Sequence, residues 1–331
     1  MEEASQTPSR AALVAQARTV VVKIGTGVLT RSGVIDRAVL ESLATEIAAL
    51  ASTPGRRVLV VSSGAIALGV EQLGLGARPK KMDALQACAA AGQGHLIRLW
   101  GEVFARHGRV VAQVLLTHSD LADRQRYLNA RGALEALVSR GAIPVINEND
   151  TVSVEEIAFG DNDSLSAQVA NLVQADLLVM LSVAPGLLDD KGERVATVGA
   201  GDRAIDRFVR SDTSAGGKGG MVTKVRAARA ANEAGAAAII APGREPGGVS
   251  SIFRGDDLGT IFLPETSPQS ARDHWIAHTL RPRGALVVDD GARRALCEGR
   301  RSLLPSGVVA VRGFFLRGDP GDIAGADGVA F

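Results

Sequence analysis

An apolar run, Thr19-Val20-Val21-Val22-Lys23, decides the fold together with Gly25 and Gly27 directly after it. An unbroken apolar run that stops at a charged residue predicts a strand buried on both faces. The glycines predict a tight turn at the end of that strand. Strands buried on both faces are typical of parallel sheets, so this stretch indicates an α/β fold.

The same pattern recurs along the chain. A second apolar run, at 57–61, leads into Ser62-Ser63-Gly64, which predicts a turn from a strand into a helix. Further strands are predicted at 110–116, 144–146, 177–181 and 237–241, and helices at 38–51, 85–106, 124–140, 163–175 and 221–234. This alternation predicts a mainly parallel sheet with helices on both faces, whose ligands bind where strands end and helices begin.

The domain organisation follows from a change in composition after about Leu263. Pro264, Ser267 and Pro268 are typical of a linker, and the shorter apolar runs after it are more typical of strands. We expect an N-terminal extension at 1–18, a large α/β domain at 19–265, a linker at 266–280 and a small β-rich domain at 281–331.

The overall composition excludes several classes of protein. The 331 residues carry a formal net charge of +1, which argues against nucleic acid or a membrane as the main partner. No apolar run is long enough to span a membrane, and the first eighteen residues have no secretory signal pattern, so we expect a cytoplasmic protein. Cys88 and Cys297 stand in no metal-binding or redox spacing.

One glycine-rich segment is a candidate phosphate site, although the common phosphate-binding motifs are absent. The segment is Gly216-Gly217-Lys218-Gly219-Gly220-Met221-Val222-Thr223-Lys224, and a predicted helix begins within it. Glycines let backbone N–H groups approach an anion, and a helix N-terminus favours negative charge. Lys23 is a second candidate cation, aimed into a cleft at the sheet edge. The alternatives are an exposed loop for the segment and a lysine at the domain rim for Lys23.

Two polar clusters are the most informative feature of the chain. Asn147-Glu148-Asn149-Asp150 follows a predicted strand, and Asp161-Asn162-Asp163-Ser164 opens a predicted helix. Carboxylates accept hydrogen bonds from an ammonium group, and amides can donate to a carboxylate, so the pair suggests recognition of an amino acid. Oxygen ligands for Mg²⁺ and helix capping by Asp163 and Ser164 are the alternatives. Ser63 is interpreted as a hydrogen-bonding ligand or a helix N-cap, since the nucleophile-elbow pattern is absent.

Together these motifs resemble the amino acid kinase family and, within it, the glutamate 5-kinases. The resemblance covers about residues 19–265 and is most specific in the two polar clusters in this order. It implies a three-layer αβα sandwich followed by a PUA-like domain at 281–331, which we expect to be incomplete because the chain stops within one of the strands that the resemblance implies. It also implies ATP-dependent phosphorylation, with Mg²⁺, of the γ-carboxylate of L-glutamate to L-glutamyl 5-phosphate, the first step of proline biosynthesis.

The resemblance also implies roles for particular residues. Catalytic roles fall to Lys23, Lys224, Asp163 and Asp161, and substrate binding to Ser63, Asp150, Asn162 and Asn147. Nucleotide binding falls to Lys23, Ser182, Val183, Gly217, Lys218, Gly219, Gly220, Met221, Val222, Thr223 and Lys224. No residue is assigned to the metal.

The resemblance implies partners as well: L-proline as a feedback inhibitor, a homo-oligomer (dimer or tetramer) and a glutamyl phosphate reductase. RNA binding is not expected, although the PUA-like domain is rich in arginine. The chain departs from the family at Ser182-Val183, where Thr-Asp is usual, and at Lys218, where threonine is usual. Two alternatives therefore stay open: an amino acid kinase with another acceptor or nucleotide, and a catalytically weak regulatory or RNA-binding relative.

Overall fold

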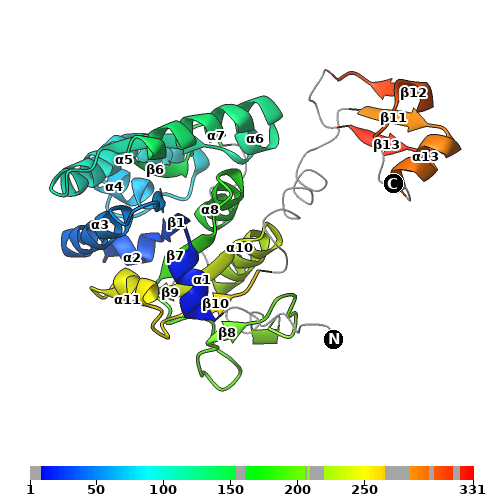
Figure 1. Ribbon diagram of the computed structural model, residues 1–331. Helices are drawn as coiled ribbons and strands as arrows, with labels where there is room; N and C mark the ends of the chain where they lie inside the picture. Colours follow the sequence, from blue (N-terminus) through cyan, green and yellow to red (C-terminus); the bar gives the residue numbers. More distant parts are fainter. Residues whose placement is uncertain are drawn as a thin grey trace.

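The large sheet is built around strand β1 (Thr19–Ile24), which hydrogen-bonds to a parallel neighbour on each side (Figure 1). The computed structural model describes residues 9–153, 161–205, 207–208, 220–264, 284–297, 302–315 and 321–331. Eight strands of this part form the sheet in the order β5-β6-β4-β1-β7-β9-β10-β8. Every neighbouring pair is parallel except β9 and β10, which confirms a mainly parallel sheet.

The predicted strands are all present in this sheet. The other members are β4 (Arg57–Ser62), β5 (Val111–Leu116), β6 (Ile143–Glu148), β7 (Leu177–Ser182), β8 (Thr197–Val198), β9 (Ala237–Pro242) and β10 (Thr260–Phe262). Strand β6 is longer than predicted, because Asn147 and Glu148 belong to it instead of following it. Strands β8 and β10 are short and were not predicted, since two or three residues carry too little apolar pattern.

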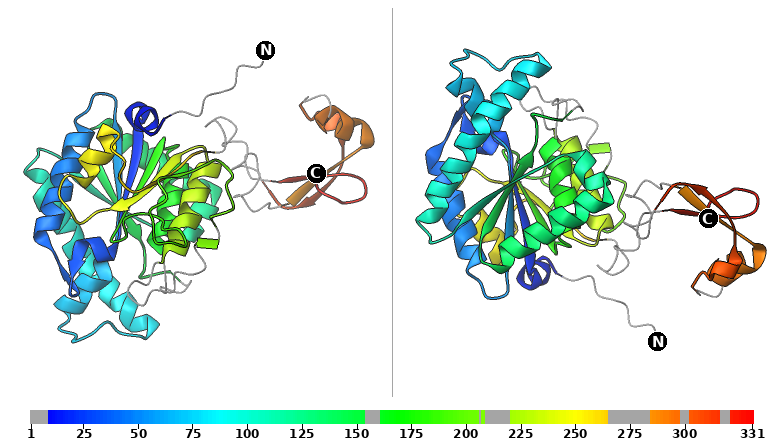
Figure 2. Two further views of the ribbon diagram at one scale, coloured as in Figure 1. Left: turned by 90° about the horizontal axis from the view of Figure 1, so that it is seen from below. Right: turned by 90° about the horizontal axis from the view of Figure 1, so that it is seen from above.

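Helices cover both faces of the sheet, so the chain forms the expected three-layer αβα sandwich (Figure 2). One apolar core includes residues of α1 (Arg10–Gln16), α2 (Thr26–Leu29), α3 (Arg37–Ala51), α4 (Ala65–Gln72), α5 (Met82–Ala105) and α11 (Gly248–Arg254). The other includes residues of α6 (His118–Ala122), α7 (Arg124–Ser139), α8 (Asp161–Leu172) and α10 (Met221–Glu233). A small hairpin, β2 (Thr30–Arg31) with β3 (Val34–Ile35), follows α2.

Strand β1 shows why its sequence is apolar throughout. Val20, Val22 and Ile24 lie in the first core, whereas Val21 lies in the second. Successive side chains of a strand point to opposite faces, so Lys23 lies on the same face as Val21. This is the face on which α8 and α10 pack side by side (Figure 1). The lysine at the end of the run is thereby directed toward these two helices.

The C-terminal residues form a second, smaller sheet, in the order β12-β11-β13. It consists of β11 (Gly284–Val288), β12 (Val308–Gly313) and β13 (Asp322–Ala324), with α13 (Asp290–Cys297) and a short 3₁₀ turn (Pro305–Gly307) between strands. A small β-rich unit was expected here. The linker expected at 266–280 lies outside the described residues. Residues 10–16, placed in the N-terminal extension, form helix α1, and Arg10 there forms an ion pair with Asp257.

Two further observations concern the helices. Helix α8 begins at Asp161, two residues before the predicted start, so Asp163 lies inside the helix instead of capping it. No helix in the described residues has the length and apolar character needed to cross a membrane.

Candidate functional site

Two lysines from distant parts of the chain meet on one carboxylate. Lys23 Nζ lies 2.5 Å from Asp163 Oδ1, and Lys224 Nζ lies 3.1 Å from Asp163 Oδ2. All three side chains are buried, with 5%, 1% and 7% of Lys23, Asp163 and Lys224 exposed. Buried charges are stable only when they are paired, so both lysines depend on the Asp163 carboxylate between them.

Each member of the cluster is held by a different element. Lys23 is the last residue but one of the central strand β1, Asp163 lies in the first turn of α8, and Lys224 lies in the first turn of α10. Thr223 Oγ1 donates a second hydrogen bond to Asp163 Oδ2 at 2.6 Å. The two ammonium groups therefore lie where strand and helix ends converge, which is the ligand-binding edge of an open α/β sheet.

Burial and charge act in opposite directions on these groups. Burial alone would raise the pKa of the Asp163 carboxyl, but the two ammonium groups and the hydrogen bonds from Lys23 and Thr223 outweigh it, so its pKa lies below the usual value. Burial lowers the pKa of the Lys23 ammonium, as does the neighbouring Lys224, and Asp163 offsets part of that shift. The site therefore keeps an ionised carboxylate whose two cationic partners would gain from a nearby anion.

Next to this cluster, side-chain amides form a continuous chain of hydrogen bonds. Asn162 Nδ2 donates to Ser63 Oγ and to Asn147 Oδ1, both at 3.0 Å, and Asn147 Nδ2 donates to Gln93 Oε1 at 2.8 Å. Asn162 precedes Asp163 on α8, so one helix turn joins the lysine cluster to this amide network. Ser63 is brought into it because Gly64 adopts a φ of 115° between β4 and α4, a left-handed conformation that favours glycine.

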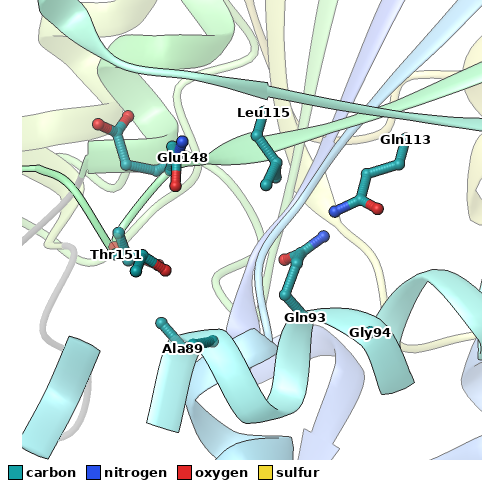
Figure 3. A pocket seen from close by; sticks show the side chains of 10 residues that line it. Ala89, Gln93, Gly94, Gln113, Leu115, Glu148 and Thr151 are labelled. Atoms are coloured by element: carbon teal, nitrogen blue, oxygen red, sulfur yellow. The ribbon is translucent and has the colours of Figure 1, made fainter. Parts of the chain in front are cut away.

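A pocket of about 300 Å³ opens beside the amide network (Figure 3). Its walls come from α5, from β5 and from the segment that ends β6. They include the carboxylate residues Glu148 and Asp150 together with Gln93, Gln113 and Thr151. Figure 3 shows Gln93 extending from α5 into this space, across from Leu115. A pocket with carboxylates and amides on its walls can bind a small molecule that carries both an ammonium and a carboxylate.

The described residues bring together most of the predicted site. Ser63 and Asn147 both accept a hydrogen bond from Asn162 Nδ2, so these three side chains lie together. Asp150 lines the adjacent pocket. Sequence reasoning missed Gln93, a glutamine on a helix that is otherwise apolar on its buried side. The position of Gln93 in the sequence does not indicate a binding residue, because a single glutamine within a helix is common.

The structure describes only some of the residues that were predicted to bind the nucleotide. Ser182 ends β7 beside β1, and its Oγ accepts a hydrogen bond from the Ala184 N–H. Val183 is 64% exposed. It lies next to Gly27, since a Cβ added to Gly27 would be 3.3 Å from Val183 Cγ1. Gly220 precedes the first residue of α10, and Met221, Val222 and Thr223 form its first turn. Gly217, Lys218, Gly219 and the side chain of Asp161 lie outside the described part of the chain.

Comparison with known proteins agrees with this geometry. The family model described as "Amino acid kinase family" matches residues 18–242, and the model described as "PUA domain" matches residues 284–329. The chain is 50% identical over 322 residues to a glutamate 5-kinase of Myxococcus xanthus, covering 95% of this chain and 85% of that protein. It is 46% identical over 327 residues to a glutamate 5-kinase of Geobacter metallireducens, covering 96% and 87%.

Among solved structures, an N-acetylglutamate synthase from Neisseria gonorrhoeae, complexed with coenzyme A and N-acetyl-glutamate, has a similar fold. Its TM-score is 0.58 at 18% identity, and the match covers 78% of this chain and 62% of that one. The fold and the lysine–carboxylate cluster at the strand ends define an open α/β protein that can hold an anion beside an amino acid. The chain belongs to the amino acid kinase family and, within it, to the glutamate 5-kinases.

Proposed function

We propose that the protein transfers the γ-phosphoryl group of ATP to the γ-carboxylate of L-glutamate and so forms L-glutamyl 5-phosphate. One observation carries this proposal: the lysine pair on Asp163 adjoins an amide network and a pocket with carboxylates on its walls. Cations at one end suit phosphates, and the mixed polar groups at the other suit an amino acid. The names of the relatives support the same reaction.

Lys23 and Lys224 would bind the phosphate oxygens and stabilise the charge that spreads over the transferred group. Asp163 would then hold the two ammonium groups apart and in place before ATP arrives, since each bonds a different oxygen of that carboxylate. Positions fixed in advance lower the reorganisation required at the transition state. Asp163 is accordingly a positioning residue in this proposal.

Ser63, Asn147, Asn162 and Asp150 would bind the amino acid. The Asp150 carboxylate suits its ammonium group, and the hydroxyl of Ser63, which accepts from Asn162, retains its own proton for donation to a carboxylate. Asn162 Oδ1 is buried and has no hydrogen-bond partner within the described residues, so it is a further acceptor for an ammonium. The acceptor carboxylate of glutamate has an ordinary pKa of about 4.3, so it is ionised at neutral pH and needs no general base.

Mg²⁺ would enter with the nucleotide. In the described part of the chain, no group of three or more His, Cys, Asp and Glu side chains is arranged to hold a metal ion. Mg²⁺ commonly binds through substrate phosphates and one or two carboxylates, and that mode needs no such group. When bound, the ion would neutralise phosphate charge, while the lysines align the transferred group.

The decisive experiment traps the acyl phosphate with hydroxylamine and measures the hydroxamate formed. The purified protein is supplied with ATP and with L-glutamate, L-aspartate or N-acetyl-L-glutamate, with Mg²⁺ and after its removal. We expect hydroxamate from glutamate only, and only with Mg²⁺. A preference for another acceptor would indicate a different amino acid kinase, and no product from any acceptor would contradict the proposal.

L-Proline is proposed as a feedback inhibitor that competes with glutamate. Proline carries the same α-ammonium and α-carboxylate pattern, so the same polar groups would bind it. We expect proline to raise the KM for glutamate without changing turnover at saturating glutamate. Unchanged rates with proline at low glutamate would exclude this role.

The product, glutamyl phosphate, would pass to a glutamyl phosphate reductase, because an acyl phosphate hydrolyses readily and is an activated form for reduction.

We also propose that the protein works as a homo-oligomer, a dimer or a tetramer. Sedimentation of the purified protein would test the oligomer, and a single monomeric species would contradict it.

A further inference from the structure

Gln93 is a polar side chain at the proposed amino acid site to which the proposed function gives no role. It is 9% exposed, lies on α5 and lines the pocket (Figure 3). Its Nε2 is buried and has no hydrogen-bond partner among the residues that the structure describes. A buried amide donor without a partner costs folding free energy, which a ligand group can offset when it binds.

The orientation of the Gln93 amide follows from one backbone donor. The Glu148 N–H can only donate, and it lies 2.9 Å from Asn147 Oδ1. The Nδ2 of Asn147 must therefore face Gln93, and it lies 2.8 Å from Gln93 Oε1. The same assignment lets Asn162 Nδ2 donate to Asn147 Oδ1. Gln93 is thus left with its two N–H bonds available, and these can bind a carboxylate or another acceptor but not an ammonium.

The position of Gln93 relative to the sheet, which its partner Asn147 defines, decides which substrate group it meets. Its partner Asn147 is on β6, and β4 separates β6 from β1, the strand that carries Lys23 near its end. Neighbouring strands lie about 4.8 Å apart, so Asn147 is about 10 Å from the lysine side of the site. The γ-carboxylate must lie at the lysines to receive the phosphoryl group. The end of glutamate that reaches Gln93 is then the α end, which offers a carboxylate.

We infer that Gln93 is a further substrate-binding residue, whose Nε2 donates a hydrogen bond to the α-carboxylate of glutamate. The inference rests on the proposed function and adds a specificity-determining contact to it. A charge-assisted hydrogen bond of this kind distinguishes glutamate from acceptors that lack an α-carboxylate.

Two variants of Gln93 test the contact. Gln93→Glu keeps an oxygen that accepts from Asn147 Nδ2 but replaces the Nε2 donor with an oxygen, and Gln93→Met removes both polar atoms. In the hydroxamate assay we expect each variant to raise the KM for glutamate about 10- to 100-fold and to leave the KM for ATP within about threefold. The matched control is Gln125→Glu, the same change at an exposed glutamine on α7 that does not line the pocket, which should alter the glutamate KM less than about threefold.

A second measurement separates the contact from a structural effect. 4-Aminobutyrate is glutamate without its α-carboxylate, and its inhibition constant against glutamate reports binding even without turnover. We expect Gln93→Met to change that constant less than about threefold, because the group that Gln93 binds is missing. Equal weakening of glutamate and 4-aminobutyrate, or an unchanged glutamate KM in an active enzyme, would overturn the assignment of Gln93 alone. An inactive wild-type protein would overturn the proposed function and this inference together.

Discussion

Lys23 and Lys224 bind opposite oxygens of one buried carboxylate, that of Asp163, at 2.5 and 3.1 Å. Two like charges this close repel each other strongly in a site with little water, so the carboxylate between them is required for both to stay buried. One net positive charge remains in the cluster. A triphosphate at the site would meet two ammonium donors that Asp163 already holds in position. The negative charge of the triphosphate is larger than that of the Asp163 carboxylate.

Replacing the shared carboxylate should destabilise the fold. Asp163→Asn removes the charged partner that two buried ammonium groups share, so we expect the free energy of unfolding at pH 7 to fall by about 3 kcal/mol or more. Urea denaturation followed by circular dichroism measures it. The control is Asp190→Asn, which breaks an exposed contact with Arg207 and should cost less than about 1 kcal/mol. Equal losses in the two variants would contradict the role of Asp163.

The same carboxylate should contribute to acid denaturation. The pKa of Asp163 is lower in the folded protein than in the unfolded chain, so the unfolded chain takes up its proton at a higher pH. Its stabilising contribution is complete well above the ordinary value of 3.8 and is lost as the pH falls from there through the lower folded value. We expect Asp163→Asn to lose less stability than the wild type between pH 5 and pH 3. Parallel pH profiles from urea denaturation would contradict this.

Loss of Lys224 should affect turnover more than folding. Lys224→Ala removes one of the two proposed phosphate contacts but leaves Asp163 paired with Lys23, so the buried carboxylate keeps a counter-charge. We expect turnover in the hydroxamate assay to fall more than about 10²-fold, as removal of a transition-state charge contact commonly does. Lys191→Ala, at an exposed lysine, is the control and should retain wild-type turnover. Near-normal turnover in Lys224→Ala would remove this residue from the proposed mechanism.

The sequence allows the large sheet to be predicted because its strands are apolar on both faces. The run from Val20 to Val22 divides between two cores, which leaves no polar face and excludes an exposed strand. The polar clusters were recognisable for the related reason that carboxylates and amides stand directly at strand and helix ends. The meeting of Lys23 with Lys224 follows from the sheet order, since β1 and the helices α8 and α10 converge at one edge.

Gln93 could not be found in this way. Its place in the amide network depends on how closely α5 approaches β6 and α4, and no pattern of residue types encodes that distance. The signal that does exist is indirect: Gly92 precedes Gln93 on α5, and Gly69 of α4 lies against Gly92. Two glycines inside predicted helices indicate close packing of backbones only once the helices are known to cross.

The close crossing of α4 and α5 gives the last prediction. A Cβ added at Gly92 would lie 1.9 Å from the Ala65 carbonyl oxygen and 2.4 Å from the Gly69 nitrogen. Both are backbone atoms and cannot move aside as a flexible side chain can. Gly92→Ala should therefore force the two helices apart and lower the free energy of unfolding by at least about 2 kcal/mol.

Separation of these helices should also weaken glutamate binding. Ser63 immediately precedes the turn into α4, and Gln93 follows Gly92 on α5, so the shift moves the two ends of the amide network relative to each other. We expect Gly92→Ala to raise the KM for glutamate more than the KM for ATP, measured in the hydroxamate assay. Gly101→Ala is the control on the same helix, where an added Cβ meets nothing within 4 Å. It should instead stabilise the fold by about 0.5–1 kcal/mol, because alanine favours a helix more than glycine does. Similar stability in the two variants would show that α4 can retreat from α5 without cost, and the close crossing would then not be what positions Gln93.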